Sequence, residues 1–306
     1  MNKQGILVVG SSNIDLVVTA QRFPNPGETI FGKTFEMFPG GKGANQAVCA
    51  ARLGCRTLFI GKMGNDDFQE RLSQLLLNDG IDIRNILIDQ NEHTGTALIT
   101  VDNSGQNQII VISGSNMKLT PQDINSKSNL FSDVKVVLAQ LEIPLTTVLR
   151  TAELAKENEA DFILNPAPAA KLPDSLFPLI DFLIPNENEL ELLSGIKVTD
   201  NQSINSASRH LLNKGVKNIV VTLGSKGALF LNQNITKEFP SKQVDVVDTT
   251  AAGDAFNAAL AFRISEGDSI EDAIEFANIV ASIVVTRVGA QSSMPYLNEI
   301  KNLLPY

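Results

Sequence analysis

The residues with the clearest chemical potential lie in one short stretch, Asp248-Thr249-Thr250-Ala251-Ala252-Gly253-Asp254. The run Val244-Asp245-Val246-Val247 before it predicts a strand, and a helical pattern follows from Ala255. The stretch should therefore be a strand-to-helix turn, whose small residues let the backbone N–H groups of 251–254 face one anion. Asp254 places a carboxylate beside that anion, where phosphoryl transfer needs a base for a hydroxyl. An acidic residue in a first turn can equally serve the helix dipole, so both roles stay open.

A second candidate site is Gly40-Gly41-Lys42-Gly43-Ala44-Asn45. Its glycines permit a close approach of the backbone to a ligand, and the pattern predicts a helix from Ala44 that stops at Gly54. Lys42 lies near the start of that helix, where a positive charge opposes the dipole. The alternative is a flexible loop with a solvated lysine, and the unfavourable placement of Lys42 favours a binding role.

A third stretch, Gly27 to Thr34, literally matches the phosphate-cradling pattern G-x-x-x-x-G-K-[ST]. That loop must follow a buried strand and open a helix. Here Pro24-Asn25-Pro26 precedes the match, and Pro39-Gly40-Gly41 breaks the chain shortly after it. The segment Glu28–Phe31 is also β-prone. We therefore interpret the match as accidental.

From about residue 134 the pattern alternates strand and helix, which predicts a parallel sheet covered on both faces. Ligands bind at the carboxyl ends of such strands. This rule singles out the polar residues there, among them Gln140, Glu142, Asn165 and the segment 185–189. Asn186 and Glu189 are also spaced as an N-cap and its capping-box acid, which local spacing cannot distinguish from a ligand role. Near the N-terminus, Asn13 and Asp15 share one face of an extended segment and could bind sugar hydroxyls or simply form a turn.

A small separate sheet is predicted from the segments at about 14–37 and 94–113. Asp102-Asn103-Ser104-Gly105 joins two extended runs as a hairpin, and their alternation indicates a half-exposed sheet. We expect these segments to form a β-lid. A sheet this small leaves an apolar face uncovered, so we also expect a homodimer that forms through the lid.

The composition predicts one α/β domain over residues 1–306, with a large core and no basic surface. The chain has 306 residues, 43% of them hydrophobic, and a net charge of -9. Because no Lys/Arg cluster is present, partners such as nucleic acid or an anionic membrane are not expected. Cys49 and Cys55 are not spaced as a metal site, and the N-terminus reads as a strand rather than a signal peptide. We expect a cytoplasmic protein.

Taken together, the motifs resemble those of the ribokinase (PfkB-type) family of sugar kinases. Five motifs occur in family order along nearly the whole chain: Gly-Gly-Lys-Gly-Ala-Asn at 40–45, Asn-Pro-Ala-Pro-Ala at 165–169, Pro-Asn-Glu-Asn-Glu at 185–189, Thr-Leu-Gly-Ser-Lys-Gly at 222–227 and Asp-Thr-Thr-Ala-Ala-Gly-Asp at 248–254. The wider family often has Gly-Ala-Gly before the last aspartate. Here it is Ala-Ala-Gly, the form of ribokinases themselves. The resemblance implies a three-layer α/β fold with a mostly parallel central sheet and a β-lid.

The resemblance also implies a role for each matching residue. Asp254 would be the general base, with Ala251, Ala252 and Gly253 completing the anion hole. The sugar pocket would consist of Asn13, Asp15, Gly41, Lys42, Asn45 and Glu142, together with Asp254. ATP would contact Asn186, Thr222, Gly224, Ser225, Gly227, Gly253 and Asn278, and Glu189 would hold Mg²⁺ through water. A monovalent cation such as K⁺ would activate the enzyme from a site formed by Asp248, Thr250, Val284, Arg287, Gly289 and Ser293.

The resemblance, together with the chemistry of this pocket, implies phosphorylation of D-ribose at O5 by ATP. The proposed pocket offers donors and acceptors for several hydroxyls but no aromatic surface for a base, since the chain has no Trp and its two tyrosines lie near the C-terminus. A related kinase acting on fructose, a deoxysugar or a nucleoside is the alternative. A non-catalytic sugar sensor is disfavoured, because a sensor would be free to lose Asp254 and the turn before it.

Overall fold

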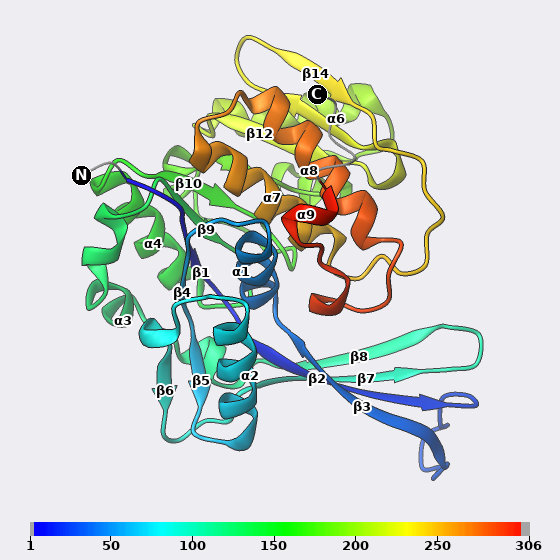
Figure 1. Cartoon of the computed structure of the whole chain (residues 1–306). Helices are drawn as coiled ribbons and strands as arrows, with labels where there is room; N and C mark the ends of the chain where they lie inside the picture. The colour runs from blue at the N-terminus through cyan, green and yellow to red at the C-terminus, as the bar shows by residue number, and fades with distance from the viewer. Residues whose placement is uncertain (1–2, 301–306) are drawn as a thin grey trace.

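The computed structural model describes residues 3–300, and an eight-stranded sheet forms its centre (Figure 1). The strand order is β14-β13-β12-β11-β10-β9-β1-β4, and β13 alone runs against its neighbours. This confirms the predicted parallel sheet. Its strands are β1 (Ile6–Val9), β4 (Thr57–Ile60), β9 (Val136–Ala139), β10 (Asp161–Leu164), β11 (Phe182–Leu183), β12 (Asn218–Thr222), β13 (Ala228–Leu231) and β14 (Thr236–Phe239).

Helices cover both faces of this sheet, because alternate residues of its strands point into two separate apolar cores. Ile6 and Val8 of β1 belong to one core, and Leu7 and Val9 belong to the other. The first core is shared with α1 (Lys42–Arg52), α2 (Asp67–Asn78), α7 (Ala252–Glu266), α8 (Ile270–Val284) and α9 (Leu297–Ile300). The second is shared with α3 (Pro121–Asn125), α4 (Leu145–Glu157), α5 (Glu187–Ser194) and α6 (Asn201–Asn213). The result is a three-layer arrangement.

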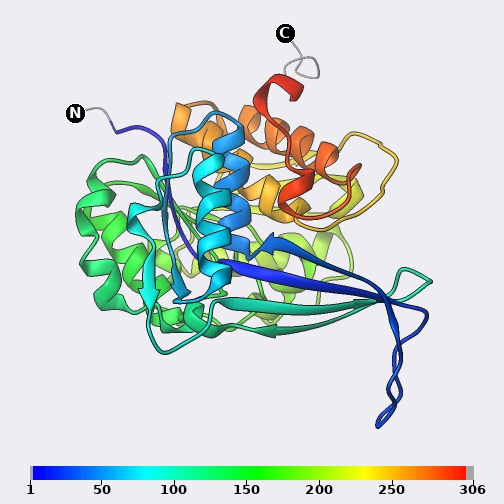
Figure 2. The same cartoon turned by 60° about the horizontal axis from the view of Figure 1, so that its bottom comes forward.

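A four-stranded sheet projects from this body (Figure 2). It consists of β2 (Asn13–Ala20), β3 (Gly32–Gly40), β7 (Gly95–Val101) and β8 (Asn107–Ile112), in the order β3-β2-β7-β8. The β2 and β7 strands run parallel, and the two outer pairs are antiparallel. The two separate chain segments that the sequence predicted to form a small sheet therefore do so. A further two-stranded sheet pairs β5 (Lys62–Gly64) with β6 (Leu87–Asp89).

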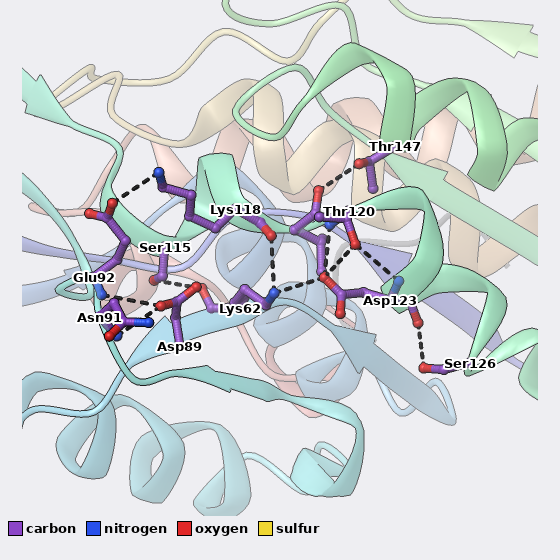
Figure 3. A network of polar contacts seen from close by, with 11 residues as sticks. Lys62, Asp89, Asn91, Glu92, Ser115, Lys118, Thr120, Asp123, Ser126 and Thr147 are labelled. Atoms are coloured by element: carbon purple, nitrogen blue, oxygen red, sulfur yellow. Dashed lines mark hydrogen bonds and ion pairs between the residues drawn. The ribbon is translucent and has the colours of Figure 1, made fainter.

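Polar contacts fix the base of the projecting sheet to the body (Figure 3). Lys62 Nζ, at the start of β5, donates to Asp123 Oδ2 at 2.8 Å and to the carbonyl oxygen of Lys118 at 3.0 Å. Lys118 forms an ion pair with Glu92, which lies just before β7, with Nζ and Oε1 2.9 Å apart. Ser115 Oγ donates to the carbonyl oxygen of Lys62 at 3.0 Å. The chain on both sides of the β7–β8 hairpin is thus attached to the body.

Short 3₁₀ turns connect several of these elements. They are η1 (Ile83–Asn85), η2 (Gly114–Lys118), η3 (Ser128–Ser132), η4 (Phe177–Leu179), η5 (Gly224–Lys226) and η6 (Gln291–Ser293).

Three local predictions can be checked against the structure. The Gly27–Thr34 match does not open a helix, because β3 begins at Gly32, and this confirms its rejection. The strand predicted at Val244–Val247 is wrong: the segment pairs with no strand, although Val247 N donates to the carbonyl oxygen of Val285 at 2.8 Å. Helix α1 begins at Lys42, two residues before the predicted start. Within residues 3–300, no helix is long and apolar enough to cross a membrane.

Candidate active site

A polar cavity of about 220 Å³ lies where the carboxyl ends of the parallel strands meet the start of α7. Its position agrees with the rule that ligands bind at this edge of a parallel sheet. The cavity is lined by Lys42, Asn165, Ala167, Ile184, Asn186, Glu189, Thr222, Thr249, Ala251, Gly253, Asp254 and Asn257. Several residues singled out from separate motifs therefore face one another.

The first turn of α7 forms one wall of the cavity. Ala251, its N-cap, has a left-handed backbone with φ of 59°, a conformation that non-glycine residues seldom adopt. No side chain caps this helix, and the N–H groups of Gly253 and Asp254 have no partner within the described chain. Because these amides lie at the positive end of a 15-residue helix, the turn can bind an anion.

The carboxylate of Asp254 is only 5% exposed and lies in this same turn. Asn45 Nδ2 donates to its Oδ2 at 3.0 Å, and Gln46 Nε2 donates to its Oδ1 at 3.0 Å. Burial raises the pKa of Asp254, whereas the charge of Lys42 and the two amide donors act to lower it. A carboxyl group with a raised pKa beside an anion site is suited to accept a proton from a hydroxyl.

Lys42 is the first residue of α1, where the helix dipole alone would disfavour its charge. Its surroundings explain the placement. The pKa of Lys42 is raised by the negative charge of Asp254, with Glu142 and Glu189 adding to the effect, while burial opposes it. Lys42 therefore neutralises a group of carboxylates that would otherwise repel one another and any phosphate.

Asn13 and Asp15 lie on one face of β2, at the start of the strand. Asn13 Oδ1 accepts a hydrogen bond from Asn116 Nδ2 at 2.7 Å. The carboxylate of Asp15 lies over Gly40, where an added Cβ would collide with both carboxylate oxygens and so displace the carboxylate. Burial, with a smaller contribution from the charge of Glu142, raises the pKa of Asp15 to about 6.

Glu142 and Gly41 pack the start of α1 against the chain at the start of β2. Glu142 Oε2 accepts from the backbone N–H of Lys42 at 2.9 Å and also from the Ser11 hydroxyl. Gly41 is the N-cap of α1, with φ of 86°. A Cβ there would lie 2.8 Å from the backbone of Ser12 and Asn13, so the close packing at this point depends on glycine.

On the opposite side of the cavity, Asn186 and Glu189 form the predicted capping box at the start of α5. Glu189 N donates to Asn186 Oδ1 and Asn186 N donates to Glu189 Oε2, both at 2.9 Å. Both residues also line the cavity, so the capping role is observed and a ligand role stays a prediction. Burial raises the pKa of Glu189, while the hydrogen bonds from Asn186 and the charge of Lys42 act against the shift.

Of the other residues predicted to bind ATP, some line this cavity and others lie outside its lining. Thr222 lines it and pairs with Asn186 through an isolated bridge. Gly224 and Ser225 belong to η5, which with Gly227 connects β12 to β13 outside the cavity lining. The side chain of Asn278, on α8, is buried and donates to the carbonyl oxygen of Phe239 at 3.1 Å.

Of the residues predicted for a monovalent cation, Asp248 is in contact with both Thr250 and Gly289, and none of the six lines the cavity. Asp248 Oδ1 accepts from Thr250 N and Oγ1 at 2.9 and 2.7 Å, and Oδ2 accepts from Gly289 N at 2.8 Å. Burial would raise the pKa of Asp248, but these hydrogen bonds keep it below its usual value. Val284 O accepts from Arg287 N at 3.1 Å, and Ser293 Oγ donates to Ala290 O at 2.7 Å.

Several polar residues at the site have no specific role in the sequence-based prediction, although Asn165 was singled out there as a polar residue at a strand end. Gln46 contacts Asp254 directly, Asn165 and Asn257 line the cavity, and Asn116 holds Asn13. Asn165 opens a motif at a strand end, and Gln46 directly follows Asn45, so both positions were usable signals. Asn116 had no comparable signal, because its partner Asn13 is distant in the sequence. Asn257 had none either, because its partner is the backbone carbonyl oxygen of Gly253.

Comparison with known proteins agrees with this geometry. Residues 3–297 match the model of the pfkB family carbohydrate kinases. The chain is 39% identical over 300 residues to a ribokinase of Staphylococcus aureus (strain COL), covering 97% of this chain and 99% of that one. It is 36% identical to a deoxyribokinase of Salmonella typhi, covering 98% of each. The solved structure of Arabidopsis thaliana ribokinase complexed with ribose and ATP aligns over 100% of both chains, at 35% identity and a TM-score of 0.95. This chain therefore belongs to the pfkB family of carbohydrate kinases.

Proposed function

We propose that this protein transfers the γ-phosphoryl group of ATP to O5 of D-ribose, yielding ADP and D-ribose 5-phosphate. The observation that carries the proposal is the position of the buried Asp254 carboxylate beside the unpartnered N–H groups of Gly253 and Asp254 in the described chain. A base can accept the proton of an attacking hydroxyl, and an adjacent anion site can stabilise the charge on the transferring phosphoryl group. The similarity to ribokinases along the whole chain supports ribose as the acceptor.

The proposed chemistry follows from these two groups. Asp254 accepts the proton of the sugar O5 hydroxyl as O5 forms a bond to the γ-phosphorus. The bond between the γ-phosphorus and the bridging oxygen breaks in line with the attack, and ADP leaves with that electron pair. The free amides of Gly253 and Asp254 stabilise the charge on the transferring phosphoryl group, whereas the amide of Ala252 already donates to the carbonyl oxygen of Thr249. Lys42 reduces the repulsion between that group and the surrounding carboxylates.

The sugar is assigned to the side of the cavity next to β2 and the start of α1. Of the proposed residues Lys42 lines the cavity, and Glu142 accepts from the backbone N–H of Lys42. Asn13, Asp15, Gly41 and Asn45 would extend the pocket beyond that lining, and the set offers both donors and acceptors, which matches a ligand rich in hydroxyls. Because polar partners left without a hydrogen bond cost about 1–3 kcal/mol each, such a pocket would select for the number and position of hydroxyls.

ATP is assigned to the side formed by α5, the end of β12 and α7. Asn186, Thr222 and Gly253 line that part of the cavity, and Gly224, Ser225, Gly227 and Asn278 would extend the nucleotide site beyond it. Glu189 is suited to hold Mg²⁺ through water, because Mg²⁺ typically uses one or two carboxylates together with substrate phosphates. When bound, Mg²⁺ would neutralise charge on the phosphates.

A monovalent cation, with K⁺ as the best candidate, is proposed for Asp248, Thr250, Val284, Arg287, Gly289 and Ser293. Their side-chain and carbonyl oxygens suit a hard cation, and Asp248 already joins the two loops through Thr250 and Gly289. Such an ion would stiffen the turn that leads into the anion site. Activity should then be higher in potassium than in sodium at equal ionic strength, and identical rates would argue against the site.

A homodimer that forms through the projecting sheet is also proposed. All six residues of β8, an edge strand, are exposed, and the side chains of Ile109, Ile110 and Val111 are more than half exposed. An exposed apolar edge strand offers unpaired backbone groups and apolar side chains to another chain. Light scattering should give the mass of a dimer for the wild type and of a monomer for Ile110→Lys. A monomeric wild type would contradict the proposal.

The two free, buried cysteines support a cytoplasmic location.

The substrate is tested by a sugar panel with ADP release as the readout. We expect kcat/KM to be highest for D-ribose, lower for fructose and adenosine, and clearly reduced for 2-deoxyribose. The similarity to a deoxyribokinase makes a deoxysugar the second candidate, and a higher kcat/KM for 2-deoxyribose than for ribose would select it. A panel with no ADP release above background would reject the kinase assignment, whereas sugar binding without turnover would indicate a sensor.

A further inference from the structure

Gln46 occupies a central position behind the Asp254 carboxylate. Its side chain is completely buried in α1 and makes three hydrogen bonds to other side chains. Nε2 donates to Asp254 Oδ1 at 3.0 Å and to Asn165 Oδ1 at 3.1 Å, and Oε1 accepts from Gln140 Nε2 at 2.5 Å. Its partners come from the end of β9, the end of β10 and the first turn of α7. Gln46 therefore connects three elements that build the site.

The orientation of the Gln46 amide is fixed by its neighbours. Asn165 Nδ2 donates to the carbonyl oxygen of Ile184 at 3.3 Å, so the oxygen of Asn165 faces Gln46 and needs a donor. An ionised carboxylate also accepts only. The NH₂ group of Gln46 must therefore face Asp254, and its oxygen must face Gln140.

The second oxygen of Asp254 is held in the same way. Asn45 Nδ2 donates to Oδ2, and Asn45 Oδ1 accepts from Gln291 Nε2 at 3.2 Å. Two consecutive residues of α1 thus fix one carboxylate oxygen each. Neither residue is among the described residues that line the cavity, but they differ in burial and in assignment. Asn45 is 6% exposed and is assigned to the sugar pocket, whereas Gln46 is completely buried and has no assigned ligand.

We propose that Gln46 is a positioning residue for phosphoryl transfer: its amide fixes Oδ1 of Asp254, and so sets the direction in which the carboxylate meets the acceptor hydroxyl. The inference rests on the proposed role of Asp254 as the base. Gln46 does not touch the sugar or ATP. Its effect passes through Asp254, with Asn165 and Gln140 holding the amide in place.

The variant Gln46→Met tests this, because methionine fills a similar volume but donates no hydrogen bond. We expect kcat to fall roughly 10- to 100-fold, the size of effect that misplacing a catalytic group has, with KM for ribose and ATP nearly unchanged. Gln46→Glu also keeps the shape and replaces the donor by an acceptor, so its kcat should fall at least as far. The matched control is Gln69→Met on α2, where a half-buried glutamine amide bonds Ser73 Oγ at 2.9 Å away from the site, and kcat should not change.

A double-mutant cycle separates positioning from a general structural role. In the Asp254→Asn background, adding Gln46→Met should leave the single-turnover rate unchanged, since the base is already absent. A further fall of the same size in that background would overturn the proposal, as would an unchanged kcat in the single variant. If Gln46→Met does not fold, Gln46→Glu takes its place in the cycle with the same expected outcomes. Normal turnover of Asp254→Asn alone would instead reject the base assignment, so the two failures are distinguishable.

Discussion

Helices α1 and α7 both begin in turns of small residues at the same edge of the large sheet, but their first backbone amides are used differently. At the start of α1, Lys42 N donates to Glu142, Gly43 N donates to Ser11 Oγ, and Ala44 N donates to Ser11 O. At the start of α7, the amides of Gly253 and Asp254 have no partner among the described residues. The first helix end is filled by the protein itself, and the second is open.

The packing around the two glycines differs in the same way. A Cβ at Gly43 would lie 2.6 Å from backbone atoms of Gly10 and Ser11, whereas a Cβ at Gly253 would meet nothing within 4 Å. The closed end holds the side chains of Lys42, Asn45 and Gln46 in fixed positions. The open end provides the free amides. A glycine-rich helix start therefore does not by itself identify a phosphate site, because its amides must also be free.

The largest difference between the two helix ends is expected in kcat, and Gly253→Ala at the start of α7 tests it. The new methyl group would occupy space assigned to the transferring phosphoryl group, so kcat should fall roughly 10²-fold, comparable to the loss of one oxyanion donor. Stability should be unchanged or higher by up to about 1 kcal/mol, because alanine favours a helix over glycine. Steady-state kinetics and thermal unfolding on the same preparation measure both. Normal turnover would show that the open helix end does not hold the reacting group.

The reverse outcome is expected from Gly43→Ala. The methyl group would collide with the backbone of Gly10 and Ser11, so the free energy of unfolding should fall by about 1–3 kcal/mol. Urea denaturation measures the change, and Gly253→Ala is the matched control because it adds the same group at the open helix end. Wild-type stability in Gly43→Ala would contradict the account of α1 as a closed end.

A smaller effect is expected in the pH dependence of KM, which should differ between ribose on the sugar side of the site and ATP on the phosphate side. Burial raises the pKa of Asp15 to about 6, so its carboxylate is lost as the pH falls through that value. A protonated Asp15 accepts sugar hydroxyls less well. KM for ribose should therefore rise below about pH 6, by up to about tenfold per pH unit, while KM for ATP stays flat. The profile is measured for both substrates. Asp15→Asn should remove the dependence, and an unchanged slope in that variant would assign it to another group.

Much of the fold followed from local pattern, because the apolar runs and their alternation record how many faces of a strand are buried. The parallel sheet, the hairpin of β7 and β8, and the capping box at Asn186 and Glu189 were all predicted correctly. The strand predicted at Val244–Val247 failed, because β-branched residues form a strand only where a partner is available. There, Val246 and Val247 remain 59% and 60% exposed.

The site was only partly predictable because its decisive contacts are long-range. Local sequence could not choose between a base and a dipole-complementing role for Asp254, since the partners Asn45 and Gln46 lie 209 and 208 residues away. In the sequence Gln46 has the features of an ordinary helix residue, because only the fold brings its partners at the ends of β9 and β10 into contact with it. The misplaced charge of Lys42 was the one local anomaly that pointed to the site correctly, and the carboxylates around it explain why.

The proposal that Asp254 is the base for the sugar hydroxyl is tested most directly in Asp254→Asn. The single-turnover rate of phosphoryl transfer from ATP to ribose is measured, and calorimetry on the same protein measures the binding of ribose and ATP. We expect a rate lower by roughly 10²–10⁴-fold, the usual contribution of a general base, with both ligands still bound. A near-normal rate with intact binding would contradict it.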